Sequence, residues 1–216
     1  MIATDSNAVF LAPAEYVDSD HPRVKELAER LARSETTPAA IARRIFYAVR
    51  DIRYGPPDFD RLASFRASTL LEEGVGYCVP KAAAFTALCR AAGLPARLAF
   101  ADVTNHLATA RTLELMGGGI FAWHGYAEVQ LGGRWVKVSP TFDAPLCERM
   151  GVKALEFDGA TDAHLQPFDA DGRAFMSYDR VHGVFHDVPA RFLAVEMPRL
   201  YPNAYATIRA GEFARG

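Results

Sequence analysis

Hydrophobic residues near the start of the chain recur every three or four positions, the spacing of an amphipathic helix. The first run begins after Asp20, a typical N-cap residue, and Pro22, which suits the first helical turn. It continues at helical spacing through residues 24–31. A second run begins after Thr37, and the glycine and prolines at 55–57 end it. The pattern predicts two helices that each bury one face.

The next helical pattern is the most hydrophobic in the chain. A short helix or turn over residues 66–73 leads into a glycine-rich approach, and a long apolar run follows over residues 78–92. Gly93-Leu94-Pro95 ends this run with the glycine and proline that typically stop a helix.

Beyond this stop the hydrophobic period changes from helical to alternating. Residues 97–103 suit a strand, and residues 105–116 suit a further helix. Residues 121–131 and 134–138 alternate on either side of Gly132-Gly133, a two-residue hairpin turn. The pattern therefore predicts adjacent antiparallel strands.

Helices followed by antiparallel strands are the order of an α+β fold. After the hairpin, many Asp, Gly and Pro residues interrupt the pattern, and one helix is predicted around residues 189–196. We expect a single domain over residues 1–216. Its core is expected at about 40–145, with an N-terminal helical extension over 1–39 and a C-terminal wrap over 146–216.

Composition narrows the classes of function. Half of the 216 residues are hydrophobic and the formal net charge is −2, so nothing electrostatic suggests a nucleic acid or a membrane as partner. The apolar runs fall short of the roughly 18 residues that a membrane helix needs. The first ten residues carry Asp5 and no basic segment, so they do not resemble a signal peptide.

Cys78 begins the most apolar predicted helix, after the approach Gly74-Val75-Gly76-Tyr77. Pro80 lies in the first turn, where its missing N–H is not needed. Free backbone N–H groups and the positive end of the helix dipole favour a thiolate at this position. Lys81 adds a positive charge within one turn. This setting predicts that Cys78 is a nucleophile.

The other two cysteines have different expected roles. Cys78 and Cys89 are eleven residues apart on one predicted helix, a rise of about 16 Å that excludes a disulfide. Cys89 shares a face with apolar residues and is expected in the core, and Cys147 is expected to be buried or inert. Three cysteines without a framework spacing predict thiols in a reducing compartment, the cytoplasm.

A cysteine nucleophile needs a base, and His124 is the best candidate among the six histidines. It lies in the predicted strand 121–131 on the polar face with Tyr126 and Glu128, so it is not simple core filling. The third partner is expected from the next strand of the hairpin.

Two linked motifs resemble those of the transglutaminase-like superfamily. Gly76-Tyr77-Cys78 and the helix that follows resemble its cysteine helix. The run from Trp123 to Val129, then Gly133-Arg134-Trp135 and Ser139-Pro140-Thr141, resembles its histidine strand and third-residue strand. The resemblance covers roughly residues 40–145. It implies a papain-like core with helices at the N-terminal side packed on an antiparallel sheet, a Cys-His-Asp triad and acyl transfer from amides.

Ser139 stands where this superfamily usually carries the triad aspartate. Asp143, four residues later, is expected to bend back and orient His124. The alternatives are that the Ser139 hydroxyl holds the imidazole, or that Cys78 and His124 act as a dyad.

The expected reaction begins with attack of Cys78 on an amide or peptide carbonyl while His124 moves the proton. Hydrolysis is favoured over transfer to an amine, because water is in excess and no amine site is recognisable. Tyr54, Tyr77 and Trp123 are expected in the wall of the cleft, against a peptide, protein or small amide substrate. No cofactor is expected.

Two other interpretations come from the same residues. A transglutaminase-like fold without its triad aspartate would serve as a non-catalytic protein-interaction module. His182 and His186, followed by Asp187, suggest a metal. The sequence lacks the glutamate of a zinc motif and any CxxC pair, so we expect these histidines to brace a loop or face solvent.

Overall fold

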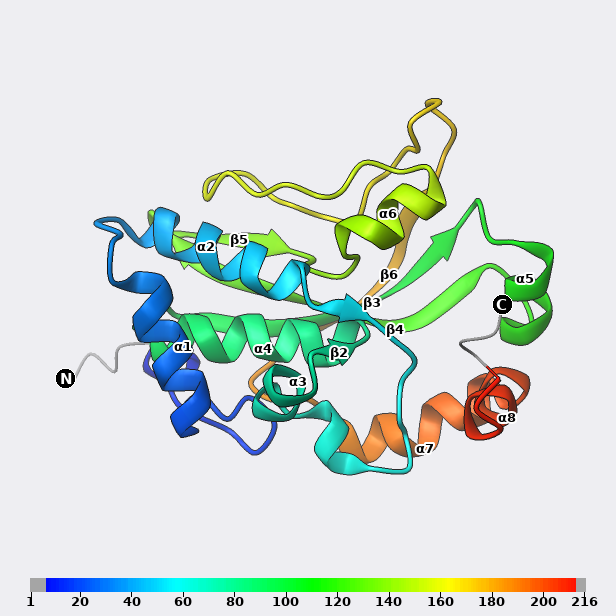
Figure 1. Cartoon of the computed structure of the whole chain (residues 1–216), viewed down its shortest axis with the longest axis horizontal. Coiled ribbons are helices and arrows are strands. Elements are labelled where there is room, and N and C mark those ends of the chain that lie inside the picture. The colour runs from blue at the N-terminus through cyan, green and yellow to red at the C-terminus, as the bar shows by residue number, and fades with distance from the viewer. Residues whose placement is uncertain (1–6, 213–216) are drawn as a thin grey trace.

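The computed structural model describes residues 7–212 (Figure 1). Its helices are α1 (Pro22–Ala32), α2 (Pro38–Arg50), α3 (Ala67–Glu73), α4 (Cys78–Ala91), α5 (Ala110–Met116), α6 (Ala144–Met150), α7 (Ala190–Leu200) and α8 (Pro202–Arg209). Its strands are β1 (Arg53–Tyr54), β2 (Val75–Gly76), β3 (Ala96–Asn105), β4 (Ile120–Leu131), β5 (Arg134–Val138) and β6 (Met176–Phe185). Two 3₁₀ segments cover Ala8–Phe10 and Leu62–Phe65.

Four strands form an antiparallel sheet in the order β5-β4-β3-β6. The hairpin at Gly132-Gly133 joins β4 to β5, as the alternating pattern predicts. A second, two-stranded sheet pairs β1 with β2 and sets Tyr54 beside Gly76, just before α4 begins. Helices packed on an antiparallel sheet confirm the α+β fold.

Helix α4 is the centre of the molecule. It packs against β3 and β4, and α1, α2 and α3 pack around it (Figure 1). Twelve of its fourteen residues are buried, so it has no polar face turned to solvent. Phe85, Leu88 and Cys89 are fully buried, which confirms that Cys89 is a core residue.

The buried guanidinium of Arg90 ties α4 to three other parts of the chain. It donates to the carbonyl oxygens of Ala12 and Ala96 at 2.9 Å each, and of His186 at 2.8 Å. Burial lowers the pKa of Arg90 to about 10, so the side chain stays charged at neutral pH. The planar fork of donors suits three acceptors that approach from different directions.

The two N-terminal helices begin with different caps. Thr37 caps α2, because its hydroxyl accepts the N–H of Ala40 at 3.2 Å. The N-cap of α1 is His21 rather than Asp20, and its Nδ1 accepts the N–H of Arg23 at 3.3 Å. The expected aspartate cap is therefore wrong by one residue, since the helix begins directly at the proline.

The C-terminal part of the chain contains more regular structure than its hydrophobic pattern indicates. The pattern does not predict β6, α6 or α8. Hydrophobic and polar residues do not alternate regularly along β6, because its register with β3 shifts twice and because Val181 and Val184 are exposed. Eight of its ten residues nevertheless pair with β3, and the strand forms one edge of the sheet (Figure 1).

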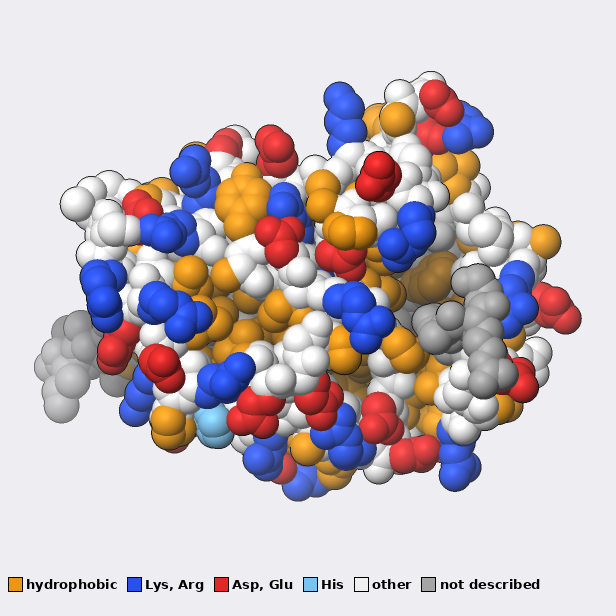
Figure 2. Space-filling model, viewed as in Figure 1, with side chains coloured by type: hydrophobic (Ala, Val, Ile, Leu, Met, Phe, Trp, Pro, Cys, Tyr) orange, Lys and Arg blue, Asp and Glu red, His pale blue; other side chains and the backbone are white. Residues whose placement is uncertain are grey.

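The surface mixes charges of both signs. On the face shown in Figure 2, basic and acidic side chains are interspersed and hydrophobic side chains are visible between them. None of the helices within residues 7–212 has the length and apolar character needed to cross a membrane.

We predict that Arg90→Met destabilises the protein by about 3–5 kcal/mol, because one buried and two partly buried carbonyl oxygens lose their donor. Urea unfolding followed by circular dichroism measures this change. Arg199→Met is the matched control: this arginine pairs with Glu196 at the surface, and its loss should leave the midpoint unchanged. Equal midpoints for both variants would contradict the role given to Arg90.

Candidate active site

The N-terminus of α4 lies against β4 at Gly125. A Cβ atom at Gly125 would stand 3.0 Å from the Cα of Val79, so a larger residue would push the helix and the strand apart. Backbone N–H groups of Gly125, Val79 and Cys78 itself lie near the Cys78 sulfur and lower the pKa of its thiol. Since Gly125 directly follows His124, the cysteine motif and the histidine motif meet at this contact.

The Cys78 side chain is partly exposed, but protein atoms enclose the sulfur on most sides. Burial raises the pKa of the Cys78 thiol to about 11, and the three backbone N–H groups and Lys81 lower it by less. The helix N-terminus therefore lowers the pKa of Cys78 as expected, but burial raises this pKa by more. Burial therefore acts against the thiolate that the helix N-terminus is expected to favour.

Lys81 lies one turn after Cys78 but turns away from the sulfur. It is fully buried, and its Nζ donates to the carbonyl oxygens of Arg50 at 2.9 Å and Ile52 at 2.7 Å. Burial lowers the pKa of Lys81 to about 8, and the nearby Asp143 carboxylate opposes this shift. Lys81 therefore closes the C-terminal end of α2.

His124 is 5% exposed. Its backbone neighbour Gly125 faces α4, whereas the His124 ring lies edge-to-face with the ring of Tyr178, 6.0 Å between centroids. Burial lowers the pKa of His124 to about 3, and His164 acts in the same direction. The imidazole is neutral at pH 7, and its buried Nε2 has no hydrogen-bond partner among residues 7–212.

Tyr178, from β6, belongs to this cluster although the sequence pattern does not identify it. Its hydroxyl lies 3.0 Å from the hydroxyl of Ser139. Burial raises the pKa of Tyr178 to about 12, partly offset by Ser139, and the charge of Cys78 acts on it as well. Tyr178 thus stands beside His124, Ser139 and Cys78. No sequence signal marks it, because β6 carries no clear alternating pattern.

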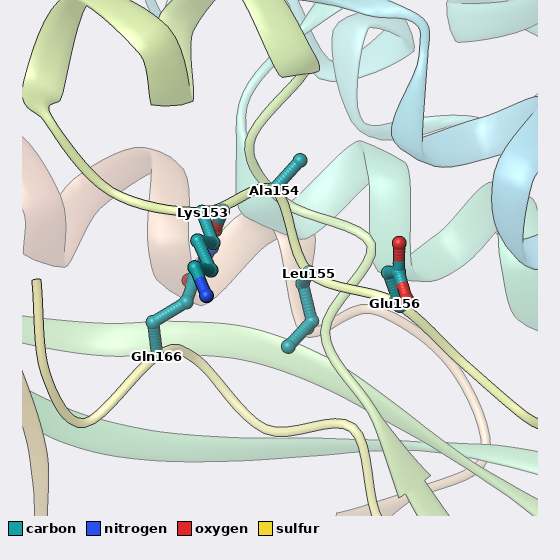
Figure 3. A pocket seen from close by; sticks show the side chains of 5 residues that line it. All are labelled: Lys153, Ala154, Leu155, Glu156 and Gln166. Carbon is teal, nitrogen blue, oxygen red and sulfur yellow. The ribbon is translucent and has the colours of Figure 1, made fainter. Parts of the chain in front are cut away.

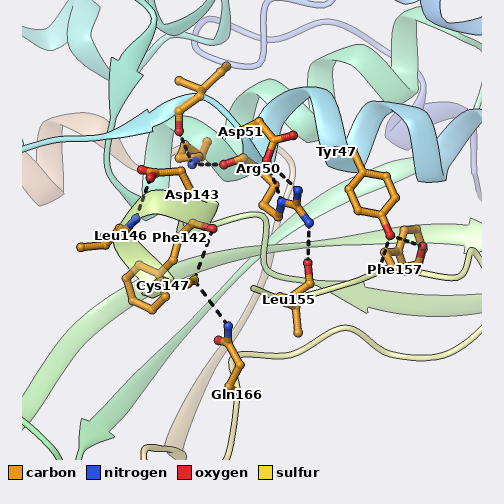
Figure 4. Close-up of polar contacts among 12 residues, drawn as sticks. Tyr47, Arg50, Asp51, Phe142, Asp143, Leu146, Cys147, Leu155, Phe157 and Gln166 are labelled. Carbon is orange, nitrogen blue, oxygen red and sulfur yellow. Dashed lines mark hydrogen bonds and ion pairs between the residues drawn. The ribbon is translucent and has the colours of Figure 1, made fainter. Parts of the chain in front are cut away.

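Asp143 is placed differently from its expected role. It is the N-cap of α6, because one carboxylate oxygen accepts the Leu146 N–H at 2.9 Å (Figure 4). The other carboxylate oxygen accepts the Tyr54 N–H at 2.6 Å. Within the described part of the chain, neither Asp143 nor Ser139 hydrogen-bonds His124. The turn after Ser139 leads straight into α6, and the helix uses the aspartate as its cap.

Two of the three expected wall residues, Tyr54 and Tyr77, lie within electrostatic range of Cys78. Burial raises the pKa of both Tyr54 and Tyr77, and the charge of Cys78 adds to both shifts. Trp123 lies elsewhere: its indole stacks on the ring of His182 at 4.0 Å between centroids, with the planes 5° apart. His182 lies within β6 rather than in a loop.

One open hollow lies away from these residues. It has a volume of about 580 Å³ and lies along the segment that follows α6, lined by Lys153, Ala154, Leu155, Glu156 and Gln166 (Figure 3). Neither Cys78 nor His124 lines it. Residues 7–212 contain no group of three His, Cys, Asp or Glu side chains arranged to hold a metal ion.

Comparison with known proteins gives a family and several distant structures. The sequence profile of the transglutaminase-like superfamily matches residues 25–140. No curated protein matches the chain.

Several solved structures resemble this chain at low sequence identity. A candidate cysteine protease from Cytophaga hutchinsonii has a TM-score of 0.46 and 22% identity, covering 82% of this chain and 53% of that one. A candidate protease from Parabacteroides distasonis has a TM-score of 0.43 and 17% identity, covering 62% of this chain and 26% of that one. The periplasmic domain of TgpA from Pseudomonas aeruginosa has a TM-score of 0.41 and 24% identity, covering 61% of this chain and 45% of that one. The chain thus spans about half or less of each of these structures.

We predict that the alkylation rate of Cys78 rises about tenfold per pH unit between about pH 7 and pH 10, because a pKa of about 11 leaves little thiolate at neutral pH. Iodoacetamide labelling followed by peptide mass spectrometry measures this rate. Cys89 and Cys147 are buried and should label far more slowly.

His124→Asn is the control for this profile. Because His124 is already neutral above about pH 3, its replacement should leave the slope unchanged. A plateau between about pH 6 and pH 8 that His124→Asn abolishes would show a preformed thiolate–imidazolium pair and contradict the neutral resting state.

Proposed function

The chain belongs to the transglutaminase-like superfamily, and from this premise we propose that it is a cysteine enzyme acting on amide or peptide bonds through a thioester on Cys78. The observation that carries the proposal is the position of the partly exposed residue Cys78 at the start of α4, beside the strand that holds His124. Hydrolysis is the favoured outcome, and transfer to an amine uses the same thioester.

In the proposed reaction the Cys78 sulfur bonds to the carbonyl carbon of the amide as its proton passes to the His124 imidazole. The carbon–nitrogen bond then breaks, and the amine leaves with that proton. Water attacks the thioester, His124 takes a proton from the water, and the acid and the free thiol are released. Backbone N–H groups at the start of α4 are the natural donors to the oxyanion.

The first proton transfer has an electrostatic cost that the site itself offsets. Burial disfavours a thiolate and an imidazolium when each is considered alone. Transfer between them creates both charges at once, and opposite charges attract more strongly in a low-dielectric site than in water. We propose that the ion pair exists only while the substrate carbonyl is being attacked.

The third member of the site is proposed to be different from a triad aspartate. Both carboxylate oxygens of Asp143 are occupied by backbone N–H groups, and the ring of Tyr178 packs against His124. We propose that Cys78 and His124 work as a dyad whose imidazole is held by packing. The orienting role that the sequence predicts for Asp143 is not part of this proposal, and the Asp143→Asn variant described below tests it.

A second function is favoured by one observation. The face of the sheet that carries His124 is covered by Tyr178 of β6 and lies near His164, both from the C-terminal segment. Such cover, with no carboxylate bonded to His124 among residues 7–212, fits a non-catalytic interaction module.

We propose the cytoplasm as the compartment of this protein. Its three free cysteines support a reducing environment.

Turnover separates the two functions. The purified protein is incubated with a panel of glutamine-containing peptides and simple amides, with and without a primary amine, and mass spectrometry identifies the products. We expect free acid as the main product, with Cys78→Ala and His124→Ala each losing about 10³-fold or more in kcat. Cys147→Ala, the matched control, should retain activity. A folded wild-type protein with no turnover on any substrate would favour the module.

We predict that Asp143→Asn lowers kcat by less than about tenfold, because the aspartate contacts Tyr54 and Leu146 rather than His124. Steady-state kinetics on the best substrate of the panel measures the change. A loss comparable to that of His124→Ala would instead assign Asp143 as the orienting member of a triad.

A further inference from the structure

The sheet is irregular at one place next to the candidate base. The register between β3 and β4 shifts between Ala101, which pairs with His124, and Val103, which pairs with Phe121. The register between β3 and β6 also shifts, once on each side of Ala101 and Asp102. Bulges of this kind redirect side chains and are frequent beside active sites.

The side chain of Asp102 stands at the centre of these shifts. One carboxylate oxygen accepts the backbone N–H of Trp123 at 3.1 Å and contacts Nε2 of His182 at 2.6 Å. Asp102 belongs to β3, Trp123 to β4 and His182 to β6. One oxygen atom thus joins three strands where their registers slip.

Trp123 has a backbone conformation that a bulky residue avoids. Its φ is +58°, in the left-handed region, and it is the one non-glycine residue of positive φ among residues 7–212. Such a conformation persists only where the surroundings hold it. Here the backbone N–H is held by Asp102, and the indole is held between the stacked ring of His182 and the edge of Phe192, 4.8 Å between centroids.

The residue that follows Trp123 is His124. The backbone angles at Trp123 therefore set where the strand resumes and in which direction the His124 side chain leaves it. We infer that Asp102 is a positioning residue: its carboxylate, held in place by His182, fixes the Trp123 bulge and so aims His124 at the reacting proton. This inference rests on the proposed function.

The role differs from that of a triad carboxylate. Asp102 bonds a backbone N–H rather than the imidazole, so an acceptor oxygen is needed but a negative charge is not. Asp102→Asn keeps an acceptor at the same place, whereas Asp102→Ala removes it. If Asp102 instead stabilised an imidazolium through its negative charge, both Asp102→Asn and Asp102→Ala would lower activity.

The test compares these variants by kcat and KM on the amide substrate. Asp102→Asn is expected within about threefold of wild type in both constants. Asp102→Ala is expected to lose about 30–100-fold in kcat with KM changed less than about threefold, as for a misplaced catalytic group. Asp179→Ala is the matched control: this exposed carboxylate lies beside the other register shift of β6 and bonds Thr104, and its loss should leave kcat unchanged.

A second measurement keeps the inference testable if Asp102→Ala does not fold or if wild type shows no turnover. His182→Ala removes the contact and the stacked ring, and is expected to shift the imidazole NMR resonances of His124, whereas Asp179→Ala leaves them in place. Absence of turnover together with this shift refutes the proposed function but supports the positioning role. Unshifted His124 resonances, or unchanged kcat in folded Asp102→Ala, would overturn it.

Discussion

The approach of α4 to β4 at Gly125 sets the geometry on which the rest of the site depends. Because no side chain separates the Val79 backbone from the strand, the first turn of the helix lies directly on β4. The Cys78 sulfur then lies near backbone N–H groups of both the helix and the strand. The apolar character of α4 serves this contact, since a helix buried on all sides has little freedom to shift along the sheet.

Burial controls the charges of this site more strongly than the helix dipole does. It raises the pKa of Cys78 and lowers that of His124, and each shift favours the neutral form of its group. A neutral pair avoids the cost of two isolated buried charges. The surrounding polar groups are already engaged: Lys81 with the end of α2, Asp143 with α6 and Tyr54, and Ser139 with Tyr178. The Nε2 atom of His124, by contrast, has no hydrogen-bond partner among residues 7–212.

Local patterns predict much of this structure, and long-range contacts account for what they miss. The period of α2, the apolar run of α4 and the Gly132-Gly133 hairpin are each encoded within a few residues of themselves. Tyr178 and Asp102 contact residues that are distant in the sequence. The irregular strand β6 has no regular hydrophobic period from which it could be predicted.

Asp143 shows a competition that sequence spacing does not resolve. A short acidic side chain before a helix bonds the nearest free N–H groups, and here it caps α6 instead of reaching the histidine. The pKa of Cys78 differs from its expected direction for a related reason: the dipole of α4 is a local property, whereas burial depends on the whole fold.

The central claim is that Cys78 forms the covalent bond to the acyl group. Intact-mass spectrometry of the protein quenched in acid during reaction with an activated acyl donor tests this most directly, followed by peptide mapping. The account predicts a single acyl adduct on the peptide that contains Cys78, lost on treatment with hydroxylamine as a thioester is. Turnover of the donor with no adduct on Cys78, or with the adduct on another residue, would contradict it.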